Sequence, residues 1–155
     1  MRSGAFSSAA NWSAAKQTYA SGDFVKTQLI SSGSSFEAVA GYSRALVVEY
    51  PAHAEAFVSG CTGFDYATMT ISDDVRDQAR QCFVNIAAAL AEAGGALRHI
   101  TRVRYYLTDG GDWDAVAPVL GESLSQIRPA ATALICGLVD PRMKIEIEVD
   151  ARIPR

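Results

Sequence analysis

The most regular hydrophobic pattern in the chain lies near its C-terminus, between Met143 and Ala151. Apolar residues occupy every second position there and charged residues the positions between. A period of two over this length predicts a β-strand with one face in the core. The other face carries an acidic row, Glu146, Glu148 and Asp150, whose charges repel unless water or cations separate them. We expect the functional site to lie near this row.

Other segments show the same alternation or a shorter apolar run. In residues 100–108, apolar side chains alternate with two arginines and Tyr106, which again predicts a half-buried strand. Residues 44–50 and 55–60 are expected to form a hairpin. The remaining expectations are an edge strand at 26–31, a turn at 31–35, a loop at 61–72 and a strand at 131–138.

Two segments carry apolar residues at steps of three and four, the spacing of one helix face. The first starts after Ser72 or Asp73, either of which suits an N-cap, and ends at Gly94-Gly95. The second follows a turn at residues 109–112, and its Pro118 is expected near the first turns, where proline is tolerated. This order predicts one sheet with both helices on a single face.

The opposite face of the sheet is expected to carry Arg102 and Arg104 next to the acidic row. Rows of opposite charge on two strands suit cross-strand pairing. A sheet face with this many charges is either solvated or packed against another subunit, and we favour self-association.

The length of 155 residues suits one domain with a full hydrophobic core. We expect residues 31–155 to form it. Residues 1–30 are rich in Ser, Ala and Gly and are expected to form an N-terminal extension, either loose or docked through its aromatic side chains. The net charge of −3 argues against nonspecific nucleic-acid binding, which needs a basic footprint.

The cysteines and histidines indicate a protein with free thiols and no metal site. Three widely spaced cysteines fit neither a disulfide framework nor a metal site, so a cytoplasmic location is expected. His53 and His99 have no second ligand at metal spacing and are interpreted as surface residues. The sequence shows no secretory signal and no apolar run long enough to cross a bilayer.

Short motifs follow one another along residues 34–152. They are Val58-Ser59-Gly60-Cys61-Thr62-Gly63, Gln78-Ala79-Arg80-Gln81 with Asn85-Ile86, Ala93-Gly94, Tyr106-Leu107-Thr108-Asp109, Arg128-Pro129-Ala130 and Ile145-Glu146-Ile147-Glu148. Each motif is weak by itself, but the ordered set resembles the RidA family, also called the YjgF/YER057c/UK114 family. Residues 1–30 lie outside the resemblance.

The resemblance implies a chorismate-mutase-like α+β fold and a homotrimer whose sheets form a central β-barrel. Ligand pockets in this family lie in clefts between subunits. The best-known members hydrolyse reactive enamines and imines, such as 2-aminoacrylate, to a keto acid and ammonia. The resemblance implies no metal and no organic cofactor.

The chain departs from those deaminases at one position. In them, an arginine directly after the Pro-Ala dipeptide binds the substrate carboxylate in a bidentate fork, which a planar guanidinium does well. Here that position is Ala131, followed by Thr132. Arg128 lies on the other side of Pro129 and faces the opposite way along an extended chain, so it is a poor substitute. The sequence resembles the branch of the family that lacks this arginine.

Glu146 is the catalytic candidate, because it matches the family glutamate that positions or activates the attacking water. Partial burial beside Glu148 would raise its pKa toward a value useful for proton transfer. The alternative role is a solvated strand residue, or one paired with Arg102 or Arg104.

The substrate-binding candidates surround this glutamate in the family pattern. They are Tyr42, Arg44, Ser59, Gly60, Cys61, Tyr106, Ala131 and Thr132. Gly60 would let backbone N–H groups approach a ligand closely, and Arg44 is the best candidate for a relocated anion clamp. Each has a plainer alternative: an ion pair for Arg44, packing for the two tyrosines, and an inert thiol for Cys61.

Three functions remain open at this point. The first is hydrolytic deamination of a small enamine or imine. The second is a noncatalytic trimer that binds a small metabolite or a protein partner. The third, the endoribonuclease or translation-inhibitor activity attached to some relatives, is the least favoured, because the chain is acidic and has no histidine pair or basic groove.

Overall fold

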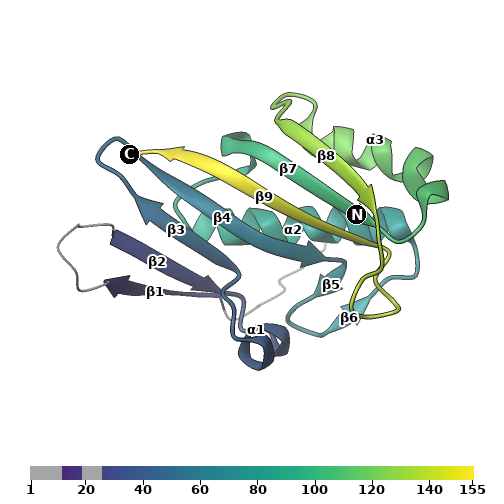
Figure 1. The fold of residues 1–155 in the computed structure, drawn as a ribbon, viewed down its shortest axis with the longest axis horizontal. Helices are drawn as coiled ribbons and strands as arrows, with labels where there is room; N and C mark the ends of the chain where they lie inside the picture. Colours follow the sequence, from purple (N-terminus) through teal and green to yellow (C-terminus); the bar gives the residue numbers. More distant parts are fainter. Residues whose placement is uncertain (1–11, 19–25) are drawn as a thin grey trace, which may run out of the picture.

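The computed structural model describes residues 12–18 and 26–155 of the chain (Figure 1). Seven strands form one sheet in the order β1-β2-β3-β4-β9-β7-β8, with β7 and β8 parallel and the other neighbours antiparallel. The strands are β1 (Ser13–Thr18), β2 (Lys26–Ser31), β3 (Ala45–Glu49), β4 (His53–Thr62), β5 (Phe64–Asp65), β6 (Thr70–Ile71), β7 (Ile100–Leu107), β8 (Ala130–Ile135) and β9 (Ile145–Pro154). The helices are α1 (Ser35–Ala40), α2 (Val75–Glu92) and α3 (Trp113–Leu124), with 3₁₀ turns η1 (Leu97–His99) and η2 (Gly110–Asp112).

Both long helices lie on one face of the main sheet, as expected. Helix α2 packs on β4 and β9, and α3 packs on α2 (Figure 1). Their apolar stripes and the inward face of the strands form one continuous core. No helix within the described ranges is long and apolar enough to span a membrane.

Strand β9 lies near the centre of the sheet, between β4 and β7. Its burial alternates along its length: Ile145, Ile147 and Val149 are fully buried, while the residues between them are partly exposed. The strand and its two faces are therefore confirmed. On the open face, Arg104 of β7 pairs with Glu148 at 2.7 Å and with Asp150 at 3.4 Å, as the opposite charges suggested.

The ends of α2 follow capping rules, with one correction. The N-cap is Asp74, not Ser72 or Asp73, and its side chain accepts a hydrogen bond from the Arg76 N–H at 2.8 Å. The helix stops at Gly94, whose φ of +76° is the left-handed conformation that favours glycine.

Two short elements escaped the sequence pattern. Helix α1 follows the predicted turn and has only six residues, too few to show a period. Residues 61–72 are not a simple loop, because β4 extends to Thr62 and the small strands β5 and β6 pair beyond it. Helix α1 lines the cavity described below, and so do Thr62 and Tyr66 of the segment 61–72.

The N-terminal segment is docked over the part that the structure describes. Strand β1 pairs with β2, so residues 26–31 form a strand but not the sheet edge. Trp12 packs against the core. The boundary expected at residue 30 falls within β2, which pairs with β3. The other aromatic residues of the extension, Phe6, Tyr19 and Phe24, lie outside the described residues.

Candidate active site

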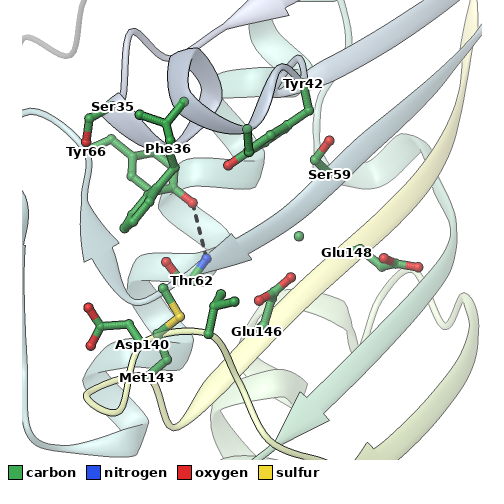
Figure 2. A pocket seen from close by; sticks show the side chains of 14 residues that line it. Ser35, Phe36, Tyr42, Ser59, Thr62, Tyr66, Asp140, Met143, Glu146 and Glu148 are labelled. Atoms are coloured by element: carbon green, nitrogen blue, oxygen red, sulfur yellow. Dashed lines mark hydrogen bonds between the residues drawn. The ribbon is translucent and has the colours of Figure 1, made fainter.

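A cavity of about 840 Å³ opens between α1 and the loop of residues 139–143 (Figure 2). The ends of β4 and β9 form its floor. Most of its walls are apolar or aromatic, and carboxylates supply most of the charge. The lining residues are Ser35, Phe36, Val39, Ala40, Tyr42, Ser59, Gly60, Thr62, Tyr66, Val139, Asp140, Met143, Glu146 and Glu148.

Glu146 projects from β9 into this cavity and lies directly against Gly60 of β4 (Figure 2). A Cβ atom added at Gly60 would fall 1.7 Å from Glu146 Oε1, so no other residue fits there while the carboxylate holds this position. The strand register shifts between Val58 and Cys61, which places Ser59 and Gly60 in a β-bulge. Such bulges re-aim side chains next to functional sites.

The Glu146 carboxylate makes no hydrogen bond or salt bridge to any residue in the described ranges. Burial raises its pKa above the ordinary value, the Arg44 charge opposes that rise, and the Glu148 charge adds to it. The expected direction of the pKa shift is therefore found. An unpaired carboxylate with a raised pKa is suited to exchange protons with a bound water.

Arg44 does not act as an anion clamp in this structure. Its side chain is 1 % exposed, and it is not among the residues that line the cavity. Its Nε donates to Glu37 Oε1 at 3.1 Å, its Nη1 to the Gly60 carbonyl at 2.6 Å and its Nη2 to the Tyr42 hydroxyl at 2.9 Å. The sequence could not reveal this, because the partner carboxylate belongs to the short helix α1. Arg44 instead supports the cavity wall from behind.

Glu37 completes this buried network. Its carboxylate accepts hydrogen bonds from Ser31 Oγ at 2.6 Å, from the Ser32 N–H at 3.0 Å and from the Ser32 hydroxyl. Burial by itself would raise the pKa of Glu37, but the serine hydroxyls and Arg44 outweigh burial and hold the pKa below its ordinary value. The network ties α1, which carries Phe36 and Val39 of the cavity wall, to β3 and β4.

The remaining candidates from the β4 region have different surroundings. Tyr42 lies at the cavity mouth, 37 % exposed, with its hydroxyl accepting from Arg44. Ser59 lines the cavity, but its hydroxyl donates to the Ser43 carbonyl at 2.7 Å and its N–H to the Arg44 carbonyl at 2.9 Å. Cys61 is fully buried and does not line the cavity; burial raises the pKa of its thiol to about 11, so it is inert packing.

Sequence reasoning about the site missed two polar residues of α2. Buried Gln78 donates to the Ser72 carbonyl at 2.7 Å and to the Arg142 carbonyl at 2.8 Å. Asn85 donates to the Thr62 and Phe64 carbonyls at 3.1 and 2.8 Å. These side chains fix the two loops that border the cavity. A polar residue within an apolar helix stripe was the signal that could have identified them.

Three predicted residues lie away from this cavity within one chain. Tyr106 of β7 lies opposite Glu146 in the strand register but does not line the cavity. Ala131 and Thr132 lie on β8, which is separated from β9 by β7. Every residue of β8 is exposed. Among the described residues, no cluster of His, Cys, Asp and Glu could hold a metal ion.

Comparison with known proteins places this geometry in a family. The family model described as Endoribonuclease L-PSP matches residues 32–153. An uncharacterised protein of Streptomyces coelicolor is 30 % identical over 123 residues, which cover 79 % of this chain and 89 % of that protein. A crystal structure from Mycobacterium tuberculosis, described as a member of the YjgF/YER057c/UK114 family, has a TM-score of 0.72 and 34 % identity, covering 82 % of this chain and 99 % of that chain.

The chain belongs to the RidA family. A RidA from an Antarctic Psychrobacter species gives a TM-score of 0.64 at 32 % identity, covering 72 % of this chain and 88 % of that chain. The family and the chorismate-mutase-like α+β fold expected from the motifs are thus confirmed.

Ala131 is the position at which the sequence departs from the arginine of the best-known deaminases. The position after the Pro-Ala dipeptide lies on the exposed strand β8 and holds no cation here. Two further arginines that contact cavity-lining or neighbouring residues are occupied. Arg142 pairs with Asp140 at 2.7 Å and lies over the Phe64 ring, and Arg104 pairs with Glu148.

Proposed function

We propose that this chain is a RidA-type hydrolase that converts a small enamine or imine into a carbonyl compound and ammonia. The observation that carries the proposal is the Glu146 carboxylate, which lies against Gly60 in the cavity and has no partner among the residues described. Burial raises its pKa above the ordinary value, which suits this group to accept a proton from water and to return it.

The proposed reaction starts from the protonated imine, which an enamine reaches by protonation at carbon. Glu146 accepts a proton from water as the water oxygen bonds to the imine carbon, giving a neutral carbinolamine. Glu146 then returns that proton to nitrogen. The C–N bond breaks and releases ammonia as the carbon–oxygen double bond forms, the carbinolamine hydroxyl gives its proton to Glu146, and Glu146 passes that proton to ammonia. The sum is R₂C=NH₂⁺ + H₂O → R₂C=O + NH₄⁺, with no other reactant.

We further propose that the chain works as a homotrimer with the ligand in a cleft between subunits. Support comes from β8, which is an exposed edge strand along its whole length and carries apolar Leu134 and Ile135, 52 % and 58 % exposed. In such an assembly, Tyr106, Ala131 and Thr132 would face the cavity of a neighbouring copy. Ala131 and Thr132 would then contact the ligand although β7 separates their strand from Glu146 of their own chain.

Ammonia release from imines generated in place by amine and amino-acid oxidases tests the hydrolase proposal. We expect the wild-type protein to accelerate release, and Glu146→Gln to lower the rate by about 100-fold or more. The matched control is Glu122→Gln, which makes the same charge change on the exposed side of α3, where Glu122 is 60 % exposed. No rate above buffer for any imine, or full activity in Glu146→Gln, would overturn the proposal.

A second candidate function is noncatalytic binding of a small metabolite. The observation that favours it is Ala131, which leaves the family's carboxylate site without its arginine. Stabilisation by a metabolite in a thermal-shift screen, without turnover, would support this alternative. RNA cleavage is not proposed, because the cavity is acidic and no histidine lines it in the part of the chain described.

A further inference from the structure

The charge of the cavity constrains what it can bind. The side chains of Asp140, Glu146 and Glu148 line it, and no lysine or arginine does so within the described ranges. Asp140 and Glu148 already have cationic partners at 2.7 Å, Arg142 and Arg104. Glu146 is therefore the carboxylate left to pair with a ligand.

The arginine behind this wall has no unpaired nitrogen with which to pair directly with an incoming anion. Arg44 is 1 % exposed, and its three nitrogens donate to Glu37, Gly60 and Tyr42. Within one chain, a ligand carboxylate would lie beside two or three protein carboxylates, and none of the described residues offers it a free cation. Repulsion between like charges is strongest where water is scarce, as in this partly buried site.

The rest of the wall suits an apolar body. Phe36, Met143 and Ala40 contribute apolar surface, and Val39 and Val139 lie at the rim, 88 % and 94 % exposed. The two valines come from α1 and from the loop of residues 139–143, which border the opening on opposite sides. A small aliphatic or aromatic group would bury this surface.

Thr62 provides an independent observation in the wall of the cavity. It lines the cavity, its side chain is 5 % exposed, and its Oγ1 has no hydrogen-bond partner among the described residues. Buried hydroxyl groups in native proteins nearly always have a partner. Thr62 Oγ1 is thus an unpaired buried polar atom beside the cavity, which a polar ligand atom would satisfy.

From this arrangement we infer that the cavity selects cationic ligands, namely amines or iminium ions that have a small apolar body and no carboxylate. The cationic nitrogen pairs with Glu146, and the apolar body contacts Phe36, Val39 and Met143. As a statement about the substrate, this inference rests on the proposed hydrolase function; as a statement about binding, it does not. The substrates would then be imines derived from monoamines rather than from amino acids.

Calorimetric titration of the full chain with three probes of one shape tests this. The probes are benzylammonium, benzyl alcohol and phenylacetate, compared at one ionic strength. We expect benzylammonium to bind at least about tenfold more tightly than phenylacetate, with benzyl alcohol between them. Glu146→Gln should remove the advantage of the ammonium over the alcohol, and the control Glu122→Gln should keep it.

Two results would overturn the inference. One is phenylacetate binding as tightly as benzylammonium, or no binding of benzylammonium at all. The other is an unchanged ammonium preference in Glu146→Gln. The titration separates this inference from the catalytic one: ammonium binding without ammonia release contradicts only the hydrolase, and release from α-imino acids without ammonium binding contradicts only the ligand class.

Discussion

At the scale of single residues, Gly60 determines where the Glu146 carboxylate can lie. Gly60→Ala should displace this carboxylate, because the new Cβ would fall 1.7 Å from Oε1. The clash involves the end of a flexible side chain, so we expect a small loss of stability and a large loss of ammonia release. Both are measurable on one preparation, by urea unfolding and by the ammonia assay.

Gly121→Ala is the matched control for Gly60→Ala. A Cβ at Gly121 would have nothing within 4 Å, and Gly121 lies inside α3. Alanine there should raise the unfolding free energy by about 0.5–1 kcal/mol and leave activity unchanged. Equal activity in the Gly60 and Gly121 variants would contradict the role assigned to Gly60.

Replacing Glu146 by glutamine should have opposite effects on activity and on stability. The pKa of Glu146 in the folded protein is raised above the ordinary value of 4.5. Its contribution to stability is therefore present below pH 4.5 and is lost as pH rises through the folded pKa. Glutamine does not ionise, so Glu146→Gln avoids the free-energy cost of the buried charge. The variant should therefore unfold at a higher urea concentration than wild type at neutral pH and yet be inactive. A neutral-pH destabilisation would show that the carboxylate has a partner.

The positions of the site residues were partly predictable from the sequence. The motif Ile145-Glu146-Ile147-Glu148 singled out Glu146, and the structure places this residue in the cavity wall without a hydrogen-bond or salt-bridge partner among the described residues. Arg44 could not be assigned correctly, because its charge suggested a ligand contact while its partner, Glu37, lies in a helix with no visible period. Buried ion pairs of this kind depend on the fold, and no local pattern reports them.

At the scale of elements, α1 depends on the Glu37 network. Glu37→Gln leaves Arg44 buried without its counter-charge, so we expect a loss of about 3 kcal/mol of unfolding free energy. The Glu37 pKa is lowered in the folded state, so its contribution is present above pH 4.5 and is lost as pH falls through the folded pKa. The difference between wild type and Glu37→Gln should therefore shrink in acid.

Urea unfolding of the two proteins at neutral pH and near pH 3 measures this difference. Amide hydrogen exchange of residues 35–40 should also speed up in the variant, because α1 loses its main attachment. A difference that stays constant with pH would mean that Glu37 does not contribute as a charged group.

Long periodic elements were predictable, and short ones were not. Strand β9 and helix α2 have ten and eighteen residues, enough for alternation or a helical stripe to be read. Helix α1 has six residues, and β5 and β6 have two each. Their structure comes from tertiary contacts, such as the hydrogen bonds from Asn85 to the Thr62 and Phe64 carbonyls.

At the scale of the whole molecule, the exposed strand β8 should be an assembly surface. Leu134 is 52 % exposed and pairs in register with Tyr106, on the open face of the sheet. Leu134→Glu would place a charge in the proposed interface and should convert the trimer to monomers, with loss of activity. Analytical ultracentrifugation reports the change directly.

The control for assembly is Val84→Glu, since Val84 is 56 % exposed on α2 and lies on the helix side of the sheet. This variant should remain trimeric. A monomeric wild type, or a Leu134→Glu protein that remains trimeric, would contradict the proposed assembly. In the proposed assembly, this strand would bring Ala131 and Thr132 to the cavity of a neighbouring copy.

The central claim is that the Glu146 carboxylate transfers the proton of the attacking water. The pH dependence of ammonia release by wild type and by Glu146→Gln tests it most directly. The rate should fall on the acid side with an apparent pKa above the ordinary 4.5 of a glutamate, because protonation removes the base. The residual rate of Glu146→Gln should lack this acid limb, whereas the same limb in the variant, or a flat profile in wild type, would contradict the claim.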